Sequence, residues 1–292
     1  MKIGCIGQGW IGKNYADHFE ERKFSLVRYA KENGYERNKE HIRSCDVVFI
    51  AVPTPTTPRG FDASIVEEVL SLIGRGKIAI IKSTIVPGTA RRLQKKFKDK
   101  IILYSPEFLR EAYARHDVDR PERNIIGLPS DTARHRAAAK RVMKILPKAP
   151  YERICTSDEA EMTKYAGNTF LYMKVVYMNM LYDLAHALGA DWNIIAENLA
   201  ADSRIGSSHL QPVHASGHAE TRGRGAGGHC FIKDFAAFAD LYRKTVSDAT
   251  GHELLTALER KNSELLRTSG KDLNLLEEVY GNTRLTRQTD RL

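Results

Sequence analysis

Short apolar runs alternate with amphipathic stretches along the first half of the chain. The apolar runs predict buried strands at residues 2–7, 24–29, 46–52, 78–84, 101–104 and 124–128. The spacing of apolar residues predicts helices at residues 13–21, 64–73 and 133–146. Because strands that alternate with helices build parallel sheets covered on both faces, we expect an α/β fold with a Rossmann-type, doubly wound parallel sheet over residues 1–150.

The pattern changes after Pro147 and Pro150. Residues 158–188 predict a single helix of about thirty residues, roughly 45 Å long. Its apolar positions recur at helical spacing and are Met173, Val176, Tyr177, Met180, Leu181 and Leu184. A helix this long needs support along its length, so we expect this stripe in the core or in a homodimer contact. An all-α domain built on this helix is therefore expected at residues 151–268, and a polar tail at residues 269–292.

Composition narrows the class of protein. The chain has 292 residues, 42% hydrophobic and 28% charged, which is typical of a soluble globular protein. No apolar run approaches the length of a membrane span, and we expect neither a signal peptide nor a membrane partner. The four cysteines lack paired metal-ligand spacing, so we expect free thiols, a cytoplasmic location and no metal. The net charge of +9 suits a phosphate-bearing ligand, and the absence of repeated basic–aromatic alternation argues against nucleic acid.

A glycine fingerprint follows the first expected strand. It reads Gly7-Gln8-Gly9-Trp10-Ile11-Gly12 and leads into a helix. In this context the first glycine makes the turn, the second admits a pyrophosphate, and the third lets helix and strand pack. We therefore expect a dinucleotide cofactor on the amino end of that helix.

The second expected strand departs from this fingerprint. An acidic residue at its end would bind the adenosine ribose, but the chain has Arg28 in this region. Arg28 or Lys31 could instead accept a 2′-phosphate, and Glu32 could act as a displaced acid. The cofactor is expected to be NAD, with NADP as the open alternative.

Polar side chains follow several expected strands. Ligands bind beyond the carboxyl ends of parallel strands, so we expect Thr54, Thr56, Ser83, Thr84 and the turn of residues 105–107 to line one cleft. A proline in this turn favours a helix start, which would place Glu107 and Glu111 on one helical face. Such carboxylates suit either the helix dipole or general-base chemistry.

A second group of reactive residue types lies in the helical half. Glu161, Lys164 and Asn168 share one face of the long helix, either as a solvated stripe or as donors to a reactive centre. Residues 223–234 crowd four glycines before Cys230 and end in Lys233 and Asp234. A cysteine beside a helix amino end favours thiolate, although a flexible loop with an inert cysteine is an equal alternative. His209, His214 and His218 lack the spacing of a metal site.

These segments together resemble the UDP-glucose/GDP-mannose dehydrogenase family. The resemblance spans residues 1–268 and rests on the fingerprint, Val52-Pro53-Thr54-Pro55-Thr56, Lys82-Ser83-Thr84, Ser105-Pro106-Glu107-Phe108-Leu109-Arg110-Glu111, Glu161-Met162-Thr163-Lys164-Tyr165 with Asn168, Ser203-Arg204-Ile205-Gly206 and Gly227-Gly228-His229-Cys230-Phe231-Ile232-Lys233-Asp234. It implies a homodimer through the long helix and a role in supplying precursors for polysaccharide synthesis.

The resemblance also implies a reaction. The C6 alcohol of a nucleotide sugar becomes an aldehyde and then a carboxylate, while two NAD are reduced. Cys230 would form a thiohemiacetal and then a thioester. Lys164 and Asn168 would hold the oxyanion, Asp234 would act with Lys164, and Glu107 and Thr84 would orient water.

Binding residues follow from the same resemblance. Beyond the fingerprint, the cofactor-binding positions would be Val52, Pro53, Thr54, Ser83, Thr84 and Glu111. The substrate-binding positions would be Glu107, Phe108, Leu109, Arg110, Lys164, Asn168, Arg204 and Gly227. The family's third, nucleotide-binding domain is not matched. The resemblance therefore implies the type of reaction but leaves the identity of the sugar and its nucleotide open. The alternatives are a two-electron dehydrogenase of the 3-hydroxyacid type and a cofactor-binding protein without turnover.

Overall fold

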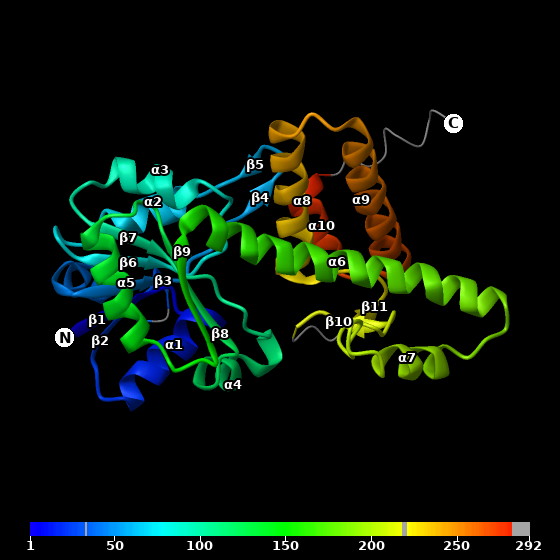
Figure 1. The fold of residues 1–292 in the computed structure, drawn as a ribbon, viewed down its shortest axis with the longest axis horizontal. Coiled ribbons are helices and arrows are strands. Elements are labelled where there is room, and N and C mark those ends of the chain that lie inside the picture. The colour runs from blue at the N-terminus through cyan, green and yellow to red at the C-terminus, as the bar shows by residue number, and fades with distance from the viewer. Residues whose placement is uncertain (33, 218–220, 282–292) are drawn as a thin grey trace. The chain divides into compact units, whose positions relative to one another are not determined.

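A computed structural model describes residues 1–32, 34–217 and 221–281 (Figure 1). They form two compact units, one made of residues 1–55 and 62–164 and the other of residues 56–61 and the chain from residue 165 onward. The boundary falls inside one long helix.

The first unit contains a seven-stranded sheet in the order β2-β1-β3-β6-β7-β8-β9. Its strands are β1 (Lys2–Ile6), β2 (Ser25–Tyr29), β3 (Val47–Ile50), β6 (Ile78–Ile81), β7 (Ile101–Tyr104), β8 (Arg123–Leu128) and β9 (Tyr151–Thr156). Neighbouring strands pair in parallel, except that β7 and β8 meet in antiparallel orientation at Tyr104 and Gly127. The expected α/β fold with a doubly wound sheet is confirmed, and the antiparallel β7–β8 pair departs from the parallel pairing that was expected.

Strand β9 corrects the expected domain boundary at residue 150. It pairs with β8 over six positions, from Arg123 with Tyr151 to Leu128 with Thr156. Its residues are exposed or half-buried, because it lies at the sheet edge. The apolar run that marks a buried strand is therefore missing from its sequence.

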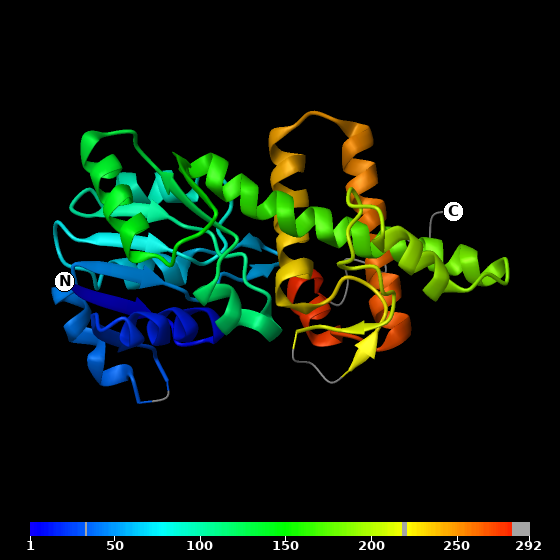
Figure 2. The same ribbon diagram turned by 60° about the horizontal axis from the view of Figure 1, so that its bottom comes forward.

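Helices pack on the sheet and enclose its core. The first unit's helices are α1 (Trp10–Glu21), η1 (Glu36–Ser44), α2 (Ser64–Leu70), α3 (Thr89–Lys96), η2 (Glu111–Tyr113), α4 (Ala114–Asp119) and α5 (Ala133–Ile145). Helix α1 contacts β1 and β2, while α5 contacts β7 and β8 (Figure 2). The core between them includes Ile3, Phe19, Phe49, Ile80 and Leu103, all at most 2% exposed. Burying these side chains is the main driving force for this half of the fold.

The second unit is mainly helical. Helix α6 (Ser157–Ala187) runs into it from the first unit and matches the helix expected at residues 158–188. Its other elements are β4 (Thr56–Thr57), β5 (Gly60–Phe61), α7 (Trp192–Ala200), β10 (His214–Ala215), β11 (Arg222–Gly223), α8 (Gly228–Thr245), α9 (Ala249–Ser269) and α10 (Leu273–Tyr280). Tyr172 of α6 stacks on Phe235 of α8, with ring centroids 3.9 Å apart, and Val176 belongs to the same buried cluster.

Helix α10 corrects the interpretation of residues 269–292 as a polar tail. Leu276, Val279 and Tyr280 pack against Ile232 and Leu266 in a buried cluster. These apolar positions lie three and four apart and give the short helix one buried face. Residues 282–292 of the expected tail lie outside the described residues.

The expected apolar stripe of α6 divides between core and surface. Val176 is fully buried, whereas Tyr177, Met180 and Leu184 are 55%, 51% and 56% exposed. Within the described ranges, we find no helix that combines the length and apolarity needed to cross a membrane.

Candidate active site

The glycine fingerprint has the geometry that a dinucleotide requires. Gly7 has a φ of +87°, and a Cβ there would lie 2.0 Å from the carbonyl oxygen of Ala51. A Cβ on Gly12 would lie 2.0 Å from the carbonyl oxygen of Gly7, so both positions exclude any side chain. Gly9 precedes the first residue of α1, and a Cβ there would meet no atom within 4 Å. The open backbone at Gly9 and the amino end of α1 therefore fit a pyrophosphate.

Hydroxyl groups join the carboxyl ends of β3 and β6. The Ser83 hydroxyl accepts from the Val52 N–H at 2.9 Å and donates to the Val52 carbonyl at 2.7 Å. The Thr54 hydroxyl donates to the Thr84 carbonyl at 2.8 Å. These residues lie together at the edge where the sequence places them. Thr56 belongs to the other unit, where it pairs with Phe61 in the β4–β5 hairpin.

Glu107 and Lys164 form a buried ion pair. The Lys164 ammonium donates to Glu107 Oε1 at 2.9 Å, and the two side chains are only 5% and 3% exposed. Glu107 Oε2 accepts from the Leu109 N–H at 2.8 Å. A carboxylate held on both oxygens in this way has a defined orientation.

The expected helix at residues 105–111 is wrong. The short helix η2 begins only at Glu111, and Arg110 is extended, with φ −86° and ψ 125°. The local bond from Leu109 to the Glu107 side chain competes with helical bonding. Glu107 is consequently buried while Glu111 is exposed, so the two do not share a helical face.

The neighbours of Glu107 divide between the site and the surface. Phe108 lies beneath the guanidinium of Arg123, 3.8 Å from the ring centroid, and 5.8 Å from the Lys164 ammonium. Arg110 instead pairs with Asp117 at 2.6 Å, and its side chain is 63% exposed. Phe108 and Leu109 are half-buried beside the ion pair, whereas Arg110 is turned toward solvent.

Lys82 is a buried cation whose environment sequence reasoning did not anticipate. It is 2% exposed, and its ammonium donates to Tyr15 Oη at 3.1 Å and Ser105 Oγ at 3.0 Å. Burial lowers the pKa of Lys82 to about 7, against the opposing charge of Glu107. The Lys82-Ser83-Thr84 segment was recognised as a family motif, but the sequence pattern around a strand end does not indicate that the lysine is buried.

Glu161 is a structural residue. It is fully buried, and its carboxylate accepts from the N–H groups of Gly88 and Ala90 at 2.6 and 2.8 Å, at the amino end of α3. Burial raises the pKa of Glu161 to about 8, while these two hydrogen bonds oppose the shift. Its place on the same helix face as Lys164 therefore reflects capping of a neighbouring helix.

In the second unit, the Asp234 carboxylate contacts Asn168 and Lys233. Asn168 Nδ2 donates to Asp234 Oδ2 at 2.6 Å, and the Lys233 ammonium pairs with Asp234 Oδ1 at 2.5 Å. The Asp234 side chain is 1% exposed. Cys230 precedes it by four residues on α8, which places both on one helical face. Lys233 had no expected role, and the structure identifies it as a partner of Asp234.

Cys230 lies within the first turn of α8, which starts at Gly228. The thiol is partly exposed. The glycines before it make room for α9 and its continuation, since a Cβ on Gly227 would lie 2.0 Å from Asp272 Oδ2 and one on Gly223 would lie 2.7 Å from the Lys271 Cβ. Close packing, and not mobility, explains this glycine-rich segment.

The approach to Cys230 is hydrogen-bonded along its length. Asn262 pairs with the backbone of Ala226 in both directions, at 2.6 and 3.0 Å. The Lys271 ammonium donates to the Gly225 carbonyl at 3.1 Å, and the Gly228 N–H donates to Asp272 at 2.8 Å. We name Asn262, Ser269, Lys271 and Asp272 the loop clamp, because each bonds a residue of the segment 224–228. Local sequence pattern did not indicate any of these four.

The segment around Arg204 is anchored through its backbone. Lys174 donates to the carbonyls of Ile205 and Gly206 at 2.8 and 3.3 Å. The Arg204 side chain is 87% exposed and pairs with Asp202 at 2.6 Å. Its expected substrate contact stays a prediction.

The histidines of the second unit do not form a cluster that the structure can describe. Burial lowers the pKa of His214 to about 4, and His218 lies outside the described residues. Across residues 1–32, 34–217 and 221–281, no group of three His, Cys, Asp or Glu side chains is arranged to hold a metal.

The expected catalytic residues thus form one group in each unit. The first unit holds Glu107 with Lys164, and the second holds Asn168, Asp234 and Cys230. Helix α6 carries members of both groups, since Lys164 and Asn168 lie one turn apart on it.

Comparison with known proteins identifies both units. Residues 30–146 match the NAD binding domain of the UDP-glucose/GDP-mannose dehydrogenase family, and residues 158–264 match its central domain. A UDP-glucose 6-dehydrogenase of Rhizobium meliloti (strain 1021) is 34% identical over 295 residues, covering 85% of this chain and 64% of that protein. UDP-glucose 6-dehydrogenase TuaD of Bacillus subtilis (strain 168) is 31% identical over 257 residues, covering 83% of this chain and 52% of that protein.

A solved structure agrees with these matches. A UDP-glucose dehydrogenase from the hyperthermophilic archaeon Pyrobaculum islandicum has a TM-score of 0.76 and 27% identity, covering 96% of this chain and 71% of that chain. This chain spans between about half and two thirds of the length of the two curated relatives. Two domain matches in family order, together with the fingerprint and the Cys230 segment, show that the chain belongs to the UDP-glucose/GDP-mannose dehydrogenase family.

Proposed function

We propose that this chain oxidises the C6 alcohol of a nucleotide sugar to the carboxylate, with Cys230 as the nucleophile and two NAD reduced per turnover. The observation that carries the proposal is the Asn168–Asp234 contact one helical turn from Cys230. Together these residues supply a thiol and a carboxylate from α8 and an amide donor from α6, all within the second unit. NAD would supply the hydride acceptor for both oxidations.

The chain's own residues account for the remaining steps. The Cys230 thiolate adds to the aldehyde carbon and gives a thiohemiacetal, loss of a second hydride gives a thioester, and water releases the acid and the thiol. Asn168 and Lys164 are proposed to hold the oxyanion, since both present N–H donors from one side of α6. Asp234 fixes the Asn168 amide through its 2.6 Å contact.

Glu107 is the proposed base for thioester hydrolysis, with Thr84 orienting the water. Its carboxylate is buried and held by the Lys164 ammonium and the Leu109 N–H. A carboxylate that is fixed and shielded from bulk solvent can accept a proton from a positioned water molecule. Val52, Thr54 and Ser83 are proposed to line the cofactor site, and Phe108, Leu109, Arg204 and Gly227 the substrate site.

Assembly and biological role complete the proposal. The exposed apolar side chains of α6 suit a homodimer contact, because large apolar patches on a monomer are commonly interfaces. The substrate is proposed to be UDP-glucose or a related nucleotide sugar, and the acid formed would supply polysaccharide synthesis in the cytoplasm.

The number of NADH formed per substrate consumed tests the chemistry. We expect two in the native chain, measured by absorbance with UDP-glucose as the first substrate. Cys230→Ser should stop at the aldehyde level with at most one, because a hydroxyl at its ordinary pKa is a poor nucleophile.

Cys155→Ser is the matched control, since Cys155 is also partly exposed but lies outside the constellation. A ratio of one that is unchanged in Cys230→Ser would favour the two-electron dehydrogenase. Tight NAD binding without reduction by UDP- or GDP-sugars would favour a cofactor-binding protein.

A further inference from the structure

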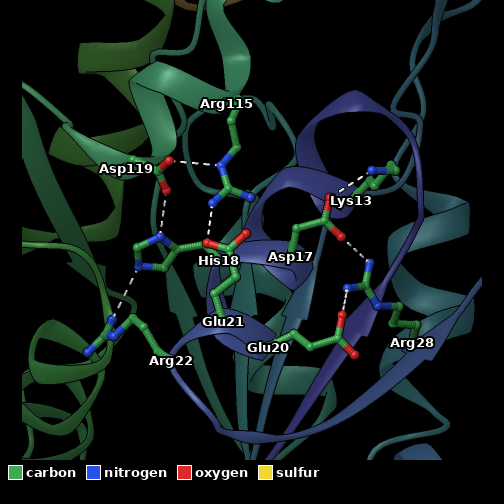
Figure 3. Close-up of polar contacts among 9 residues, drawn as sticks. All are labelled: Lys13, Asp17, His18, Glu20, Glu21, Arg22, Arg28, Arg115 and Asp119. Carbon is green, nitrogen blue, oxygen red and sulfur yellow. Dashed lines mark hydrogen bonds and ion pairs between the residues drawn. The ribbon is translucent and has the colours of Figure 1, made fainter.

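Two carboxylates of α1 hold the arginine at the end of β2. Arg28 Nη1 donates to Asp17 Oδ1 at 2.7 Å, and Arg28 Nη2 donates to Glu20 Oε2 at 2.6 Å (Figure 3). The Arg28 side chain is only 13% exposed. Both terminal nitrogens of the guanidinium are therefore engaged by acids on the same neighbouring helix.

Arg28 is the next-to-last residue of β2, the strand whose carboxyl end reads the adenosine ribose in dinucleotide folds. It precedes Tyr29, whose carbonyl accepts from the N–H of Gly7 at 2.8 Å. Its Nη1 also lies 3.5 Å from Oε1 of Gln8, inside the fingerprint. In dinucleotide folds, an acid at this strand end binds the 2′-hydroxyl of NAD, and a nearby arginine accommodates the 2′-phosphate of NADP.

The charge of Arg28 is already compensated. Asp17 also pairs with Lys13 at 2.7 Å. The net charge of this group is therefore zero, since it contains two carboxylates, Asp17 and Glu20, and two cations, Lys13 and Arg28. A 2′-phosphate that approached Arg28 would have to displace two carboxylates and would meet their negative charge. Lys31, the other candidate for a 2′-phosphate, pairs with Glu68 at 3.0 Å.

We propose that Asp17 and Glu20 are the residues by which this NAD-binding domain discriminates against NADP, because they hold Arg28 in ion pairs that a 2′-phosphate would have to break. The Arg28 guanidinium could donate hydrogen bonds to a 2′-phosphate, but its ion pairs with these two acids mask it. The inference rests on the proposed use of a dinucleotide but not on the thioester chemistry. It is therefore measured by binding, which does not require turnover.

The test uses the full chain and isothermal titration with NAD and NADP. Asp17→Asn with Glu20→Gln should release Arg28 and lower the ratio of Kd for NADP to Kd for NAD by roughly tenfold or more, as a charge-assisted contact to phosphate forms. Adding Arg28→Gln to this variant should abolish the gain. In the otherwise native chain, Arg28→Gln should leave NADP affinity within about twofold, since Arg28 is masked.

A neighbouring network between α1 and α4 supplies a matched control. Glu21 pairs with Arg115, and Asp119 pairs with both Arg115 and His18 (Figure 3). Glu21→Gln with Asp119→Asn also removes two negative charges, but it leaves the partners of Arg28 unchanged. An equal fall in the Kd ratio in this control would reduce the effect to net charge and overturn the proposal.

Two further results would also overturn it. These are a native chain that binds NADP as tightly as NAD, and a double variant that keeps the native Kd ratio. Retained NAD affinity shows that each variant is folded, and the single changes Asp17→Asn and Glu20→Gln should each give a smaller gain in the same direction. Absence of sugar oxidation alongside a normal Kd ratio would contradict the proposed function alone.

Discussion

Lys82 is a residue whose ionisation should register in the stability of the fold. Burial lowers its pKa from 10.5 in the unfolded chain to about 7, so between these values the unfolded chain binds more protons than the folded one. The cost of Lys82 is therefore complete below pH 7 and declines as the pH rises toward 10.5. The hydrogen bonds to Tyr15 and Ser105 hold the group in place at either charge.

Lys82→Met should separate this effect from other titrations. We expect the free energy of unfolding of the native chain, relative to the variant, to rise by up to about 2 kcal/mol between pH 7 and pH 9. Urea unfolding at several pH values measures it. Lys77→Met, at a partly exposed lysine paired with Asp46, is the control and should give a flat difference over this range. A flat difference for Lys82→Met as well would show that Lys82 keeps its ordinary pKa.

At the scale of elements, the loop clamp joins α9 to the start of α8. Asp272 contributes most directly, because its carboxylate accepts both from the Gly228 N–H, one of the first amides of α8, and from the Ser216 hydroxyl at 2.6 Å. The first amides of a helix have no partner inside the helix, so an external carboxylate is a cap. The clamp thereby sets the backbone on which Cys230 is presented.

Asp272→Ala should destabilise the fold by about 1–2 kcal/mol, because it removes the cap and leaves two donors unpaired. Asp272→Asn should cost less than half as much, since an amide oxygen can still accept and asparagine tolerates the φ of +53° at this position. Urea unfolding measures both. Alkylation of Cys230 by iodoacetamide in the folded state is expected to change more in the alanine variant. Equal stability of the two variants would contradict the capping role.

At the scale of the whole molecule, the exposed face of α6 concerns assembly. The large apolar side chains on it are Phe170, Tyr177, Met180 and Leu184, with Leu188 just past the helix end, each more than half exposed. Their spacing places them within about a quarter of the helix circumference. A continuous apolar stripe of this kind is the surface that we propose to be covered by a second copy of the chain.

Leu184→Glu should convert a dimer to a monomer, because burial of a carboxylate in an apolar contact is costly. Light scattering at micromolar concentration measures the mass. His186→Glu is the control, since position 186 lies on the opposite side of α6 and is exposed. A native chain that is monomeric at this concentration would contradict the proposed dimer.

Much of the fold followed from local pattern, and the exceptions have identifiable causes. The strands with continuous apolar runs were predicted, whereas β9 was missed because an edge strand need not be apolar. The helix expected at Glu107 failed because the Glu107 side chain accepts from the Leu109 backbone. The tail was misread because the buried side of α10 is evident only once Ile232 and Leu266 lie against it.

The candidate site divides in the same way. The fingerprint, Glu107, Lys164, Asn168, Cys230 and Asp234 were all proposed from sequence, because their residue types and spacing form a family pattern. The loop clamp was not, because Asn262, Lys271 and Asp272 reach partners 36 to 46 residues away. Contacts over such distances leave no periodic signal in the chain.

The sequence by itself determined the alternation of strands and helices, the turn at the fingerprint and the order of the family motifs, since burial periodicity and glycine spacing act over a few residues. The tertiary structure decided which charges compensate one another. Arg28 was open to a 2′-phosphate as a sequence, yet the fold engages it with Asp17 and Glu20. Lys164 likewise finds Glu107, 57 residues away. Ion pairs depend on side-chain positions that only packing sets, and electrostatic strength depends on the burial that packing creates.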